Sequence, residues 1–319
     1  MKTLTVEDMF RAKQDVLELE LLTPDCPLDR PILEQTLSSP GLVLAGFRER
    51  FPGGRIQILG ETEVFYLRSL DEPRRREQLE AFLSLAMPAL VVTKSLEPSP
   101  DLIEIARRHG IPVLQSRMKT GDFYRRLQPY LEEQFAPTTT MHGSLADVYG
   151  VGLLFVGRSG IGKSECVLDL VERGHRLVAD DVVTVARRGN DILIGRGLEI
   201  QRHHMEIRGI GIIDIKTLFG IRAIRQQKRI EVVVQLVDWD DNAHYDRTGL
   251  DRYEVDILGV KIPRVTVPLN AGKNITVISE VVAMNHLLKY SGVDSARRFN
   301  ESLQESMRPL RQYLEEDYE

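Results

Sequence analysis

Eight consecutive residues, Gly157-Arg-Ser-Gly-Ile-Gly-Lys163-Ser164, match the pattern of a phosphate-binding loop: Gly, four residues, Gly-Lys and then Ser or Thr. Glycines let the backbone turn its N–H groups toward phosphate oxygens, and a helix after the loop adds its positive end. Lys163 supplies a mobile charge for the outer phosphates, and the Ser164 hydroxyl can bind Mg²⁺. The residues predicted to contact a polyphosphate are Gly157, Arg158, Ser159, Gly160, Ile161, Gly162, Lys163 and Ser164.

The sequence around the loop has the context that such a loop needs. Val151–Val156 is predicted as a strand before the loop, and Glu165–Arg173 as a helix after it, with Gly174 as its end. The alternative is a glycine-rich turn with an incidental lysine. The strand–loop–helix order favours the phosphate loop.

Two adjacent carboxylates, Asp180 and Asp181, follow the predicted strand Arg176–Ala179. One can hold Mg²⁺ through water, and the other can take a proton from an acceptor hydroxyl. Two carboxylates this close are expected to raise the pKa of one of them, which suits a general base. A solvated strand end is the plainer interpretation, and Asp238, after another predicted strand, is a rival metal carboxylate.

Several segments together resemble one known family, the bacterial HPr kinase/phosphorylase. They are His142-Gly143, the loop itself, Gly174-His-Arg-Leu-Val-Ala-Asp-Asp181 and Met205-Glu206-Ile-Arg208-Gly209-Ile-Gly211-Ile-Ile-Asp214. The resemblance runs from His142 to about Asn285 and is weaker before it. The loop alone would not identify the family, but the combination is specific.

The resemblance implies a fold, an activity and partners. The catalytic domain should resemble the phosphoenolpyruvate carboxykinase core, in a homohexamer. Such enzymes phosphorylate a seryl hydroxyl on HPr, the carrier protein of the sugar phosphotransferase system, with ATP or pyrophosphate. They also reverse the modification by phosphorolysis, in which inorganic phosphate attacks phosphoserine and releases pyrophosphate. Carried over by position, the catalytic residues are His142, Lys163, Asp181 and Arg247, and the magnesium ligands are Ser164 and Glu206.

The chemistry of these positions agrees with the implied roles. Asp181 would accept the serine proton in the forward direction and return it in reverse. Arg247, in a polar stretch, can neutralise charge on the transferring phosphoryl group, although it can also be an ordinary surface arginine. His142 can position phosphate or the loop, or simply be solvated. Glu206 is preferred for Mg²⁺ over the adjacent histidines His203 and His204, because Mg²⁺ prefers oxygen ligands.

One segment departs from the family pattern. Members commonly carry Pro-Val-Arg-Pro-Gly-Arg-Asn, a stretch linked with dephosphorylation, where this chain has Pro268-Leu-Asn270-Ala-Gly272-Lys273-Asn274. Lysine lacks the two-pronged guanidinium of arginine, and Asn270 carries no charge. Phosphorolysis is therefore expected to be weaker than the kinase reaction.

Two other functions stay open from the residues alone. A phosphate loop determines the donor and not the acceptor, so a phosphotransferase acting on a small molecule is one alternative. A nucleotide-binding regulator is the other, although the sequence lacks the Asn-Lys-x-Asp motif of GTP switches. The carboxylate pair favours transfer chemistry.

The elements that must position these residues form two predicted α/β domains, residues 1–135 and 136–319, with a boundary at Ala136–Thr140. The first domain has no motif for chemistry, so its role is unknown. Its predicted strands are Gly41–Gly46, Arg55–Leu59, Ala89–Thr93 and Ile111–Leu114, and its helices are Glu72–Ala86, a helix from an N-cap at Asp101 to His109, and Gly121–Phe135. In the second domain we expect further strands at Ile192–Ile194 and Ile230–Val237, and a last helix at Asp294–Tyr313.

Composition excludes several classes of protein. A formal net charge of −5 gives no reason to expect nucleic acid as the partner, and Arg74–Arg76 is best interpreted as a solvated helix face. The two cysteines do not suggest a disulfide framework or a cysteine-rich metal site. No apolar run approaches the ~18 residues of a membrane span, and no signal peptide is evident. A soluble cytoplasmic enzyme is expected.

Overall fold

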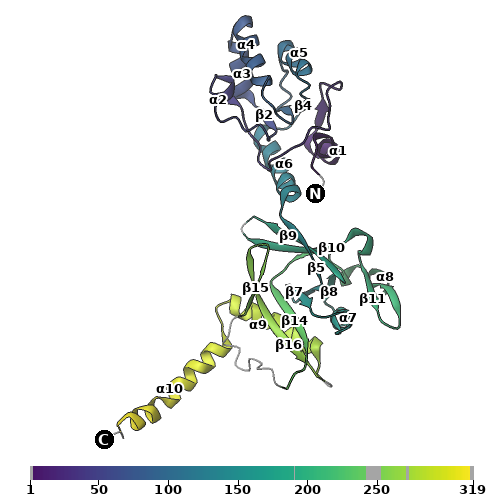
Figure 1. Cartoon of the computed structure of the whole chain (residues 1–319), viewed down its shortest axis with the longest axis vertical. Helices are drawn as coiled ribbons and strands as arrows, with labels where there is room; N and C mark the ends of the chain where they lie inside the picture. The colour runs from purple at the N-terminus through teal and green to yellow at the C-terminus, as the bar shows by residue number, and fades with distance from the viewer. Residues whose placement is uncertain (1–2, 190, 242–252, 271–272, 317–319) are drawn as a thin grey trace. The chain divides into compact units, whose positions relative to one another are not determined.

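The computed structural model describes residues 3–189, 191–241, 253–270 and 273–316, with side chains to Met307. The chain divides into two compact units, Met1–Ala136 and Pro137–Glu319 (Figure 1). Each combines helices with a partly parallel sheet, so the predicted two-domain α/β class is confirmed.

The N-terminal unit is built on a four-stranded sheet in the order β1-β4-β3-β2. β2, β3 and β4 run parallel, and β1 is antiparallel to β4. Short apolar strands suit this position, because a sheet covered on both faces buries every side chain, as in β2 and β3. The bounds are β1 Leu19–Leu21, β2 Gln57–Leu59, β3 Leu90–Val92 and β4 Val113–Ser116.

Helices cover both faces of this sheet. Side chains from α2 to α5 pack on one face, around Phe82 and Leu102. Side chains from α1 and α6 pack on the other, around Met9 and Phe123. The bounds are α1 Val6–Leu17, α2 Gly41–Leu44, α3 Glu61–Ser69, α4 Glu72–Leu83, α5 Pro100–Arg108 and α6 Thr120–Phe135.

Two predictions in this unit are wrong. Gly41–Gly46, predicted as a strand, forms the short helix α2, which buries Val43 and Leu44. A run of four apolar residues is equally consistent with a buried helical turn, so its spacing could not decide. The N-cap of α5 is Ser99 and not Asp101, because the Ser99 side chain accepts from the N–H of Leu102.

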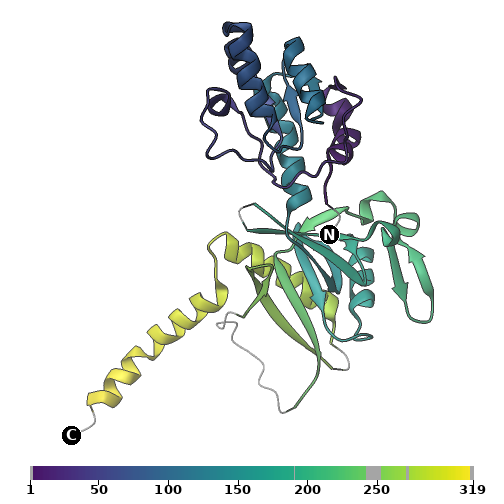
Figure 2. The ribbon, with the colours of Figure 1, turned by 45° about the horizontal axis from the view of Figure 1, so that its top comes forward.

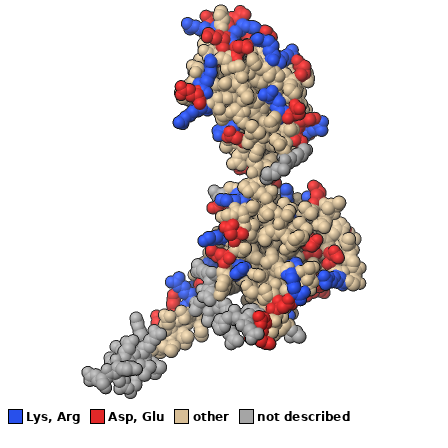
Figure 3. All heavy atoms as spheres, viewed as in Figure 1, with Lys and Arg blue, Asp and Glu red and all other residues tan. Residues whose placement is uncertain are grey.

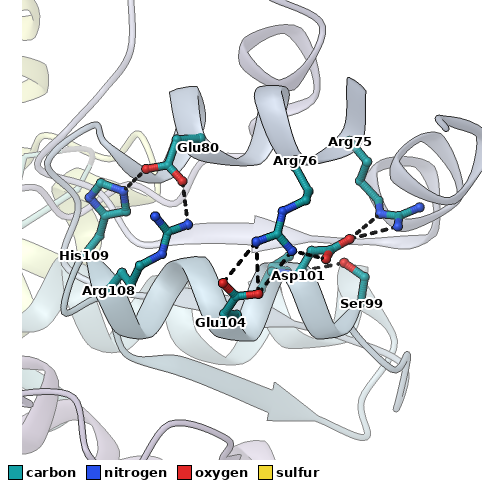
Figure 4. A network of polar contacts seen from close by, with 9 residues as sticks. Arg75, Arg76, Glu80, Ser99, Asp101, Glu104, Arg108 and His109 are labelled. Atoms are coloured by element: carbon teal, nitrogen blue, oxygen red, sulfur yellow. Dashed lines mark hydrogen bonds and ion pairs between the residues drawn. The ribbon is translucent and has the colours of Figure 1, made fainter. Parts of the chain in front are cut away.

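Asp101 instead joins an ion-pair network between α4 and α5 (Figure 4). Its carboxylate accepts from Arg75 Nε at 2.9 Å and from Arg76 Nη1 at 2.7 Å. Burial alone would raise the pKa of Asp101, but the two arginines outweigh it and hold the pKa below its ordinary value. The Arg74–Arg76 run therefore has a structural role for two of its members, beyond the solvated face predicted.

The C-terminal unit contains a six-stranded sheet in the order β15-β16-β14-β7-β6-β8. β7, β14 and β16 are parallel, and the flanking strands are antiparallel to their neighbours. The bounds are β6 Ser144–Val148, β7 Val151–Val156, β8 Arg176–Ala179, β14 Val232–Asp238, β15 Glu254–Ile257 and β16 Val260–Leu269.

Two different layers cover this sheet. On one face, Phe155 and Val234 pack against α7 (Lys163–Glu172) and α9 (Ile275–Tyr290). On the other, Leu154 and Val233 pack against an antiparallel sheet in the order β13-β10-β9-β5. That sheet comprises β5 Thr138–His142, β9 Val182–Arg188, β10 Ile192–Gly197 and β13 Gln227–Arg229.

Beyond these layers, the hairpin of β11 (His204–Ile207) and β12 (Gly211–Asp214) stands away from the six-stranded sheet in Figures 1 and 2. Short helical turns flank it: η1 (Glu199–Gln201), α8 (Ile215–Phe219) and η2 (Ile221–Ala223). The last helix is α10 (Ser295–Glu316). None of the helices in the described ranges is both long and apolar enough to span a bilayer.

Candidate active site

The phosphate-loop segment lies where the central strand β7 leads into α7. Gly157 has φ +153°, and a Cβ built there would lie 2.6 Å from the backbone oxygen of Leu236 on β14. A larger residue would therefore push the loop away from the sheet. Ile161, although predicted as a ligand contact, is 8% exposed and packs in the core, so it anchors the loop.

Lys163 and Arg158 make the main polar contacts of the loop. The Lys163 ammonium donates to the carbonyl oxygens of Gly157 at 3.2 Å and Arg158 at 3.0 Å. The Arg158 guanidinium donates to both carboxylate oxygens of Asp238, at 2.5 and 2.7 Å, and lowers the pKa of Asp238. Asp238, the rival metal carboxylate, is thus paired with Arg158 and does not line the cavity described next.

A cavity of about 130 Å³ collects most of the predicted site residues. Residues from the loop, from the end of β8 at Asp180 and from the β11–β12 hairpin line this cavity. The residues around it are Ser144, Ser159, Gly160, Gly162, Lys163, Ser164, Glu165, Asp180, Asp181, Glu206 and Arg208. The predicted phosphate-binding residues, hydroxyls and carboxylates thus line the same cavity.

The two adjacent carboxylates have different environments. Asp180 is 7% exposed, and its Oδ1 accepts from Ser144 Oγ at 2.5 Å and from Ser164 Oγ at 3.0 Å. Its Oδ2 is buried and has no hydrogen-bond partner in the described part of the chain. Burial raises the pKa of Asp180, although the Ser144 and Ser164 hydroxyls oppose it. The raised pKa of Asp180 therefore comes mainly from desolvation, whereas the sequence predicted repulsion between the two neighbouring carboxylates as the cause.

Asp181 is exposed and adopts a positive φ of 64°. Aspartate tolerates this left-handed conformation better than most residues, and such backbone strain often occurs at functional sites. The Asp181 carbonyl accepts from the N–H of Gly143 at 3.0 Å, which ties the turn to the His142-Gly143 segment. The turn thus separates one buried carboxylate from one exposed carboxylate in consecutive positions.

The hairpin contributes Glu206 and Arg208 from alternate positions, while Met205 and Ile207 are buried. The Arg208 guanidinium lies against the loop, since a Cβ built on Gly160 would be 2.5 Å from its Nη1. Neither Arg208 nor Ser144 was predicted as a site residue. The alternation around Glu206 could have indicated Arg208, but no local signal indicates Ser144.

Two of the predicted catalytic residues, His142 and Arg247, are not among the described residues around the cavity. His142 ends β5 with an exposed side chain and is not among the residues around the cavity. Arg247 lies outside the described residues. His204 Nδ1 bonds the carbonyl of Arg202, and burial lowers the pKa of His203. Within the described ranges, no three His, Cys, Asp or Glu side chains are arranged to hold a metal by themselves.

A larger depression, of about 460 Å³, lies in the N-terminal unit beside β2 and β3. Its cations largely pair with its own carboxylates, as Lys94 does with Glu61 and Arg125 with Asp122. The smaller cavity is the better candidate for catalysis, because it combines a phosphate loop with carboxylates. Cys166, just after the loop, is buried, and burial raises its pKa to about 12.

Comparison with known proteins decides the family. The sequence matches the "HPr Serine kinase N terminus" over residues 4–131 and the "HPr Serine kinase C-terminal domain" over residues 133–303. The chain belongs to the HPr kinase/phosphorylase family. The resemblance inferred from the motifs is therefore confirmed.

Individual members of this family are similar over most of the chain. An HPr kinase/phosphorylase of Chloroherpeton thalassium is 47% identical, over 87% of this chain and 82% of its own. One of Prosthecochloris aestuarii is 44% identical over 100% of this chain and 97% of its own. A solved structure of the Hpr(Ser) kinase/phosphatase from Coxiella burnetii is 34% identical, with a TM-score of 0.45, and covers 51% of this chain and 99% of its own.

Proposed function

We propose that this chain phosphorylates a serine of the carrier protein HPr with ATP or pyrophosphate, and reverses the modification by phosphorolysis. The observation that carries the proposal is the cavity that unites Lys163 and Ser164 with Asp180 and Asp181. Family membership and the names of the relatives agree with it. We also propose that the fold of the catalytic unit resembles the core of phosphoenolpyruvate carboxykinase.

The loop binds the donor. Its N–H groups and the N-terminus of α7 face the polyphosphate, and Lys163 exchanges the loop carbonyls for phosphate oxygens. Arg208, held against Gly160, is placed to add positive charge beside the transferring group. We assign a similar charge-stabilising role to Arg247, and a positioning role to His142.

Asp181 handles the proton of the acceptor. As the serine oxygen bonds to the phosphorus and the bond to the leaving diphosphate or phosphate breaks, the exposed Asp181 carboxylate takes the hydroxyl proton. In reverse, an oxygen of inorganic phosphate attacks the phosphoserine phosphorus. The serine oxygen then leaves with the proton returned by Asp181, and pyrophosphate forms.

Magnesium fits the oxygen donors of this cavity. Ser164 and Glu206 would hold it, and the unpartnered Oδ2 of buried Asp180 is a further oxygen in the same wall. Proteins that bind nucleotides typically hold Mg²⁺ through one or two carboxylates plus the phosphates of the substrate. A cluster of three His, Cys, Asp or Glu side chains, which the described residues lack, is therefore not required. The ion supplies neutralisation of phosphate charge when bound.

Exposed apolar side chains beside the cavity favour a protein acceptor over a small molecule. Ile212, paired with Glu206 in the hairpin, is 75% exposed, and Ile210 at the turn is 72% exposed. Leu218 and Ile221, just beyond the hairpin, are also exposed, and this side of the unit is mainly uncharged in Figure 3. Such patches commonly mark protein contact sites.

Mass spectrometry of purified HPr, after incubation with this chain, ATP and Mg²⁺, tests the function directly. One added phosphoryl group on a serine is expected, and its removal when inorganic phosphate replaces ATP. An unmodified HPr, with the γ-phosphoryl group found on a small molecule instead, would favour the alternative phosphotransferase. ATP binding with no transfer would favour a nucleotide-binding regulator.

The direction of the reaction is open to a separate prediction. Asn270 is exposed at the end of β16, and the Lys273 ammonium donates to the Pro268 carbonyl at 2.9 Å. Neither can grip phosphate with two parallel bonds. We expect phosphorolysis to be slower than the kinase reaction, and Asn270→Arg with Lys273→Arg to accelerate it by about 10- to 100-fold, since a charge-assisted bond contributes about 1.5–3 kcal/mol.

Pyrophosphate release from phosphorylated HPr at saturating phosphate measures this rate, and the forward rate of the same variant is the control. Comparable rates in both directions for the unaltered chain would contradict the prediction. An equal rise in both directions would mean that the arginines act on something other than phosphorolysis.

We also propose that the chain forms a homohexamer. Phe299, Leu303 and Met307 recur every four residues along α10 and are 72%, 45% and 45% exposed. A stripe of this kind is typical of a helix that packs against a partner. Light scattering of the full chain is expected to give a hexamer, and Phe299→Glu with Leu303→Glu to give smaller species. A monomeric unaltered chain would contradict this.

A further inference from the structure

The buried residue Ser144 makes a short contact with the site but belongs to no motif. It begins β6, where it pairs with Phe155 of β7, and its next neighbour Leu145 pairs with Ala179 of β8. Its side chain is 0% exposed. The hydroxyl donates to Asp180 Oδ1 at 2.5 Å, which is the shortest hydrogen bond that Asp180 makes in the described residues.

The segment that carries Ser144 is held from two sides. The Gly143 N–H donates to the Asp181 carbonyl at 3.0 Å, so the backbone is tied to the carboxylate turn. A Cβ built on Gly143 would lie 2.4 Å from the Phe155 carbonyl oxygen, so this backbone packs directly against β7. The backbone of Ser144 is therefore held in place by the sheet, and its buried hydroxyl is a fixed hydrogen-bond donor.

Two hydroxyl groups are the side-chain partners of the Asp180 carboxylate in the described residues, and backbone groups of Asp181 and Glu206 also form hydrogen bonds with it. Oδ1 accepts from Ser144 and Ser164, while Oδ2 has no hydrogen-bond partner in the described part of the chain. If the Ser144 hydroxyl were removed, Ser164 would be the single side chain in the described residues that donates a hydrogen bond to the Asp180 carboxylate. A buried carboxylate that loses such a donor turns or admits water, since leaving its oxygens unbonded is costly.

The orientation of Asp180 in turn sets that of Ser164. Ser164 donates its only hydroxyl proton to Asp180, so its lone pairs are left for another partner in the cavity. We propose that Ser144 is a positioning residue that, through Asp180, orients the Ser164 hydroxyl for Mg²⁺. This inference rests on the metal-dependent transfer proposed above and deepens it.

Direct metal binding tests this role, with Mn²⁺ as the probe and electron paramagnetic resonance of free Mn²⁺ as the readout. In the full chain, Ser144→Ala is expected to weaken Mn²⁺ binding by about 10- to 100-fold, the effect typical of residues behind a metal ligand. Ser144→Thr, which keeps the hydroxyl, is expected to restore most of the affinity. At saturating Mg²⁺, kcat for transfer should recover in Ser144→Ala, because the ligand set is unchanged.

Ser279→Ala is the matched control, because Ser279 is also 0% exposed in the same unit but bonds the Ile275 carbonyl in α9. It should leave Mn²⁺ affinity unchanged. If Ser144→Ala fails to fold, Ser144→Cys retains the volume with a weaker donor and should still weaken Mn²⁺ binding.

Three results would overturn the role of Ser144. They are unchanged Mn²⁺ affinity in a folded Ala or Cys variant, equal losses in the Ala and Thr variants, and a kcat that stays low at every Mg²⁺ concentration. A wild-type chain that transfers no phosphoryl group to HPr would instead refute the proposed function. The two failures are therefore distinguishable.

Discussion

Replacing Asp181 with asparagine is expected to slow transfer to HPr by about 10²- to 10⁴-fold, the usual contribution of a general base. Asparagine keeps the size of the side chain and tolerates the positive φ of 64°, so the turn should survive. It cannot take the serine proton. Because the same group returns that proton in reverse, phosphorolysis should fall by a similar factor.

Initial rates of HPr phosphorylation measure this loss, and ATP binding by calorimetry shows whether the loop is intact. Asp191→Asn is a matched control, because Asp191 is also an exposed aspartate with positive φ in the same unit. It should retain transfer. An Asp181→Asn variant that transfers at the unaltered rate would remove Asp181 as the base and leave the assignment to another group.

Replacing Lys163 with alanine is expected to lower kcat/KM for ATP by about 10²- to 10³-fold, as does the removal of one preorganised donor to a developing charge. The loss should affect binding of the donor as well as the rate, because the ammonium contacts the outer phosphates in both states. The fold should survive, since in the described structure this ammonium bonds only the Gly157 and Arg158 carbonyls.

Steady-state kinetics with ATP varied at saturating HPr, and calorimetric binding of ATP, measure the two parts of this effect. Lys261→Ala is the control, because Lys261 is exposed on β16 and is not among the residues around the cavity. Undiminished ATP binding in a Lys163→Ala variant that is otherwise folded would place the polyphosphate elsewhere and refute the phosphate loop.

Long elements with a clear local pattern were predictable. The predicted helix Gly121–Phe135 corresponds to α6, and the strand Val151–Val156 to β7. Helix propensity and apolar spacing act within one segment, so nearby residues carry enough information. The predicted strand Gly41–Gly46 failed because a short apolar run fits either element, and the packing of Val43 and Leu44 decided it.

In the candidate site, too, the local sequence predicted some residues, while others depend on contacts between distant parts of the chain. The loop from Gly157 to Ser164 could be predicted as one segment, because contiguous residues supply its glycines, lysine and hydroxyl, but Gly157, Arg158 and Ile161 are not among the residues around the cavity. Arg208 and Ser144 were missed, since their roles depend on contacts with Gly160 and Asp180 from distant parts of the chain. Repulsion between Asp180 and Asp181 was expected to raise the pKa of one of them, whereas burial raises that of Asp180, and burial is not visible in a local pattern.

The sequence by itself predicted a phosphate-binding loop and, through its combined motifs, determined to which family this protein belongs. Only the tertiary structure decided that Asp180 is buried while Asp181 is exposed, that Asp238 pairs with Arg158, and that Ser144 bonds Asp180. A phosphate loop works through neighbouring residues, so its chemistry is encoded locally. The other contacts depend on strand order and register, which bring residues together only when the whole sheet has formed.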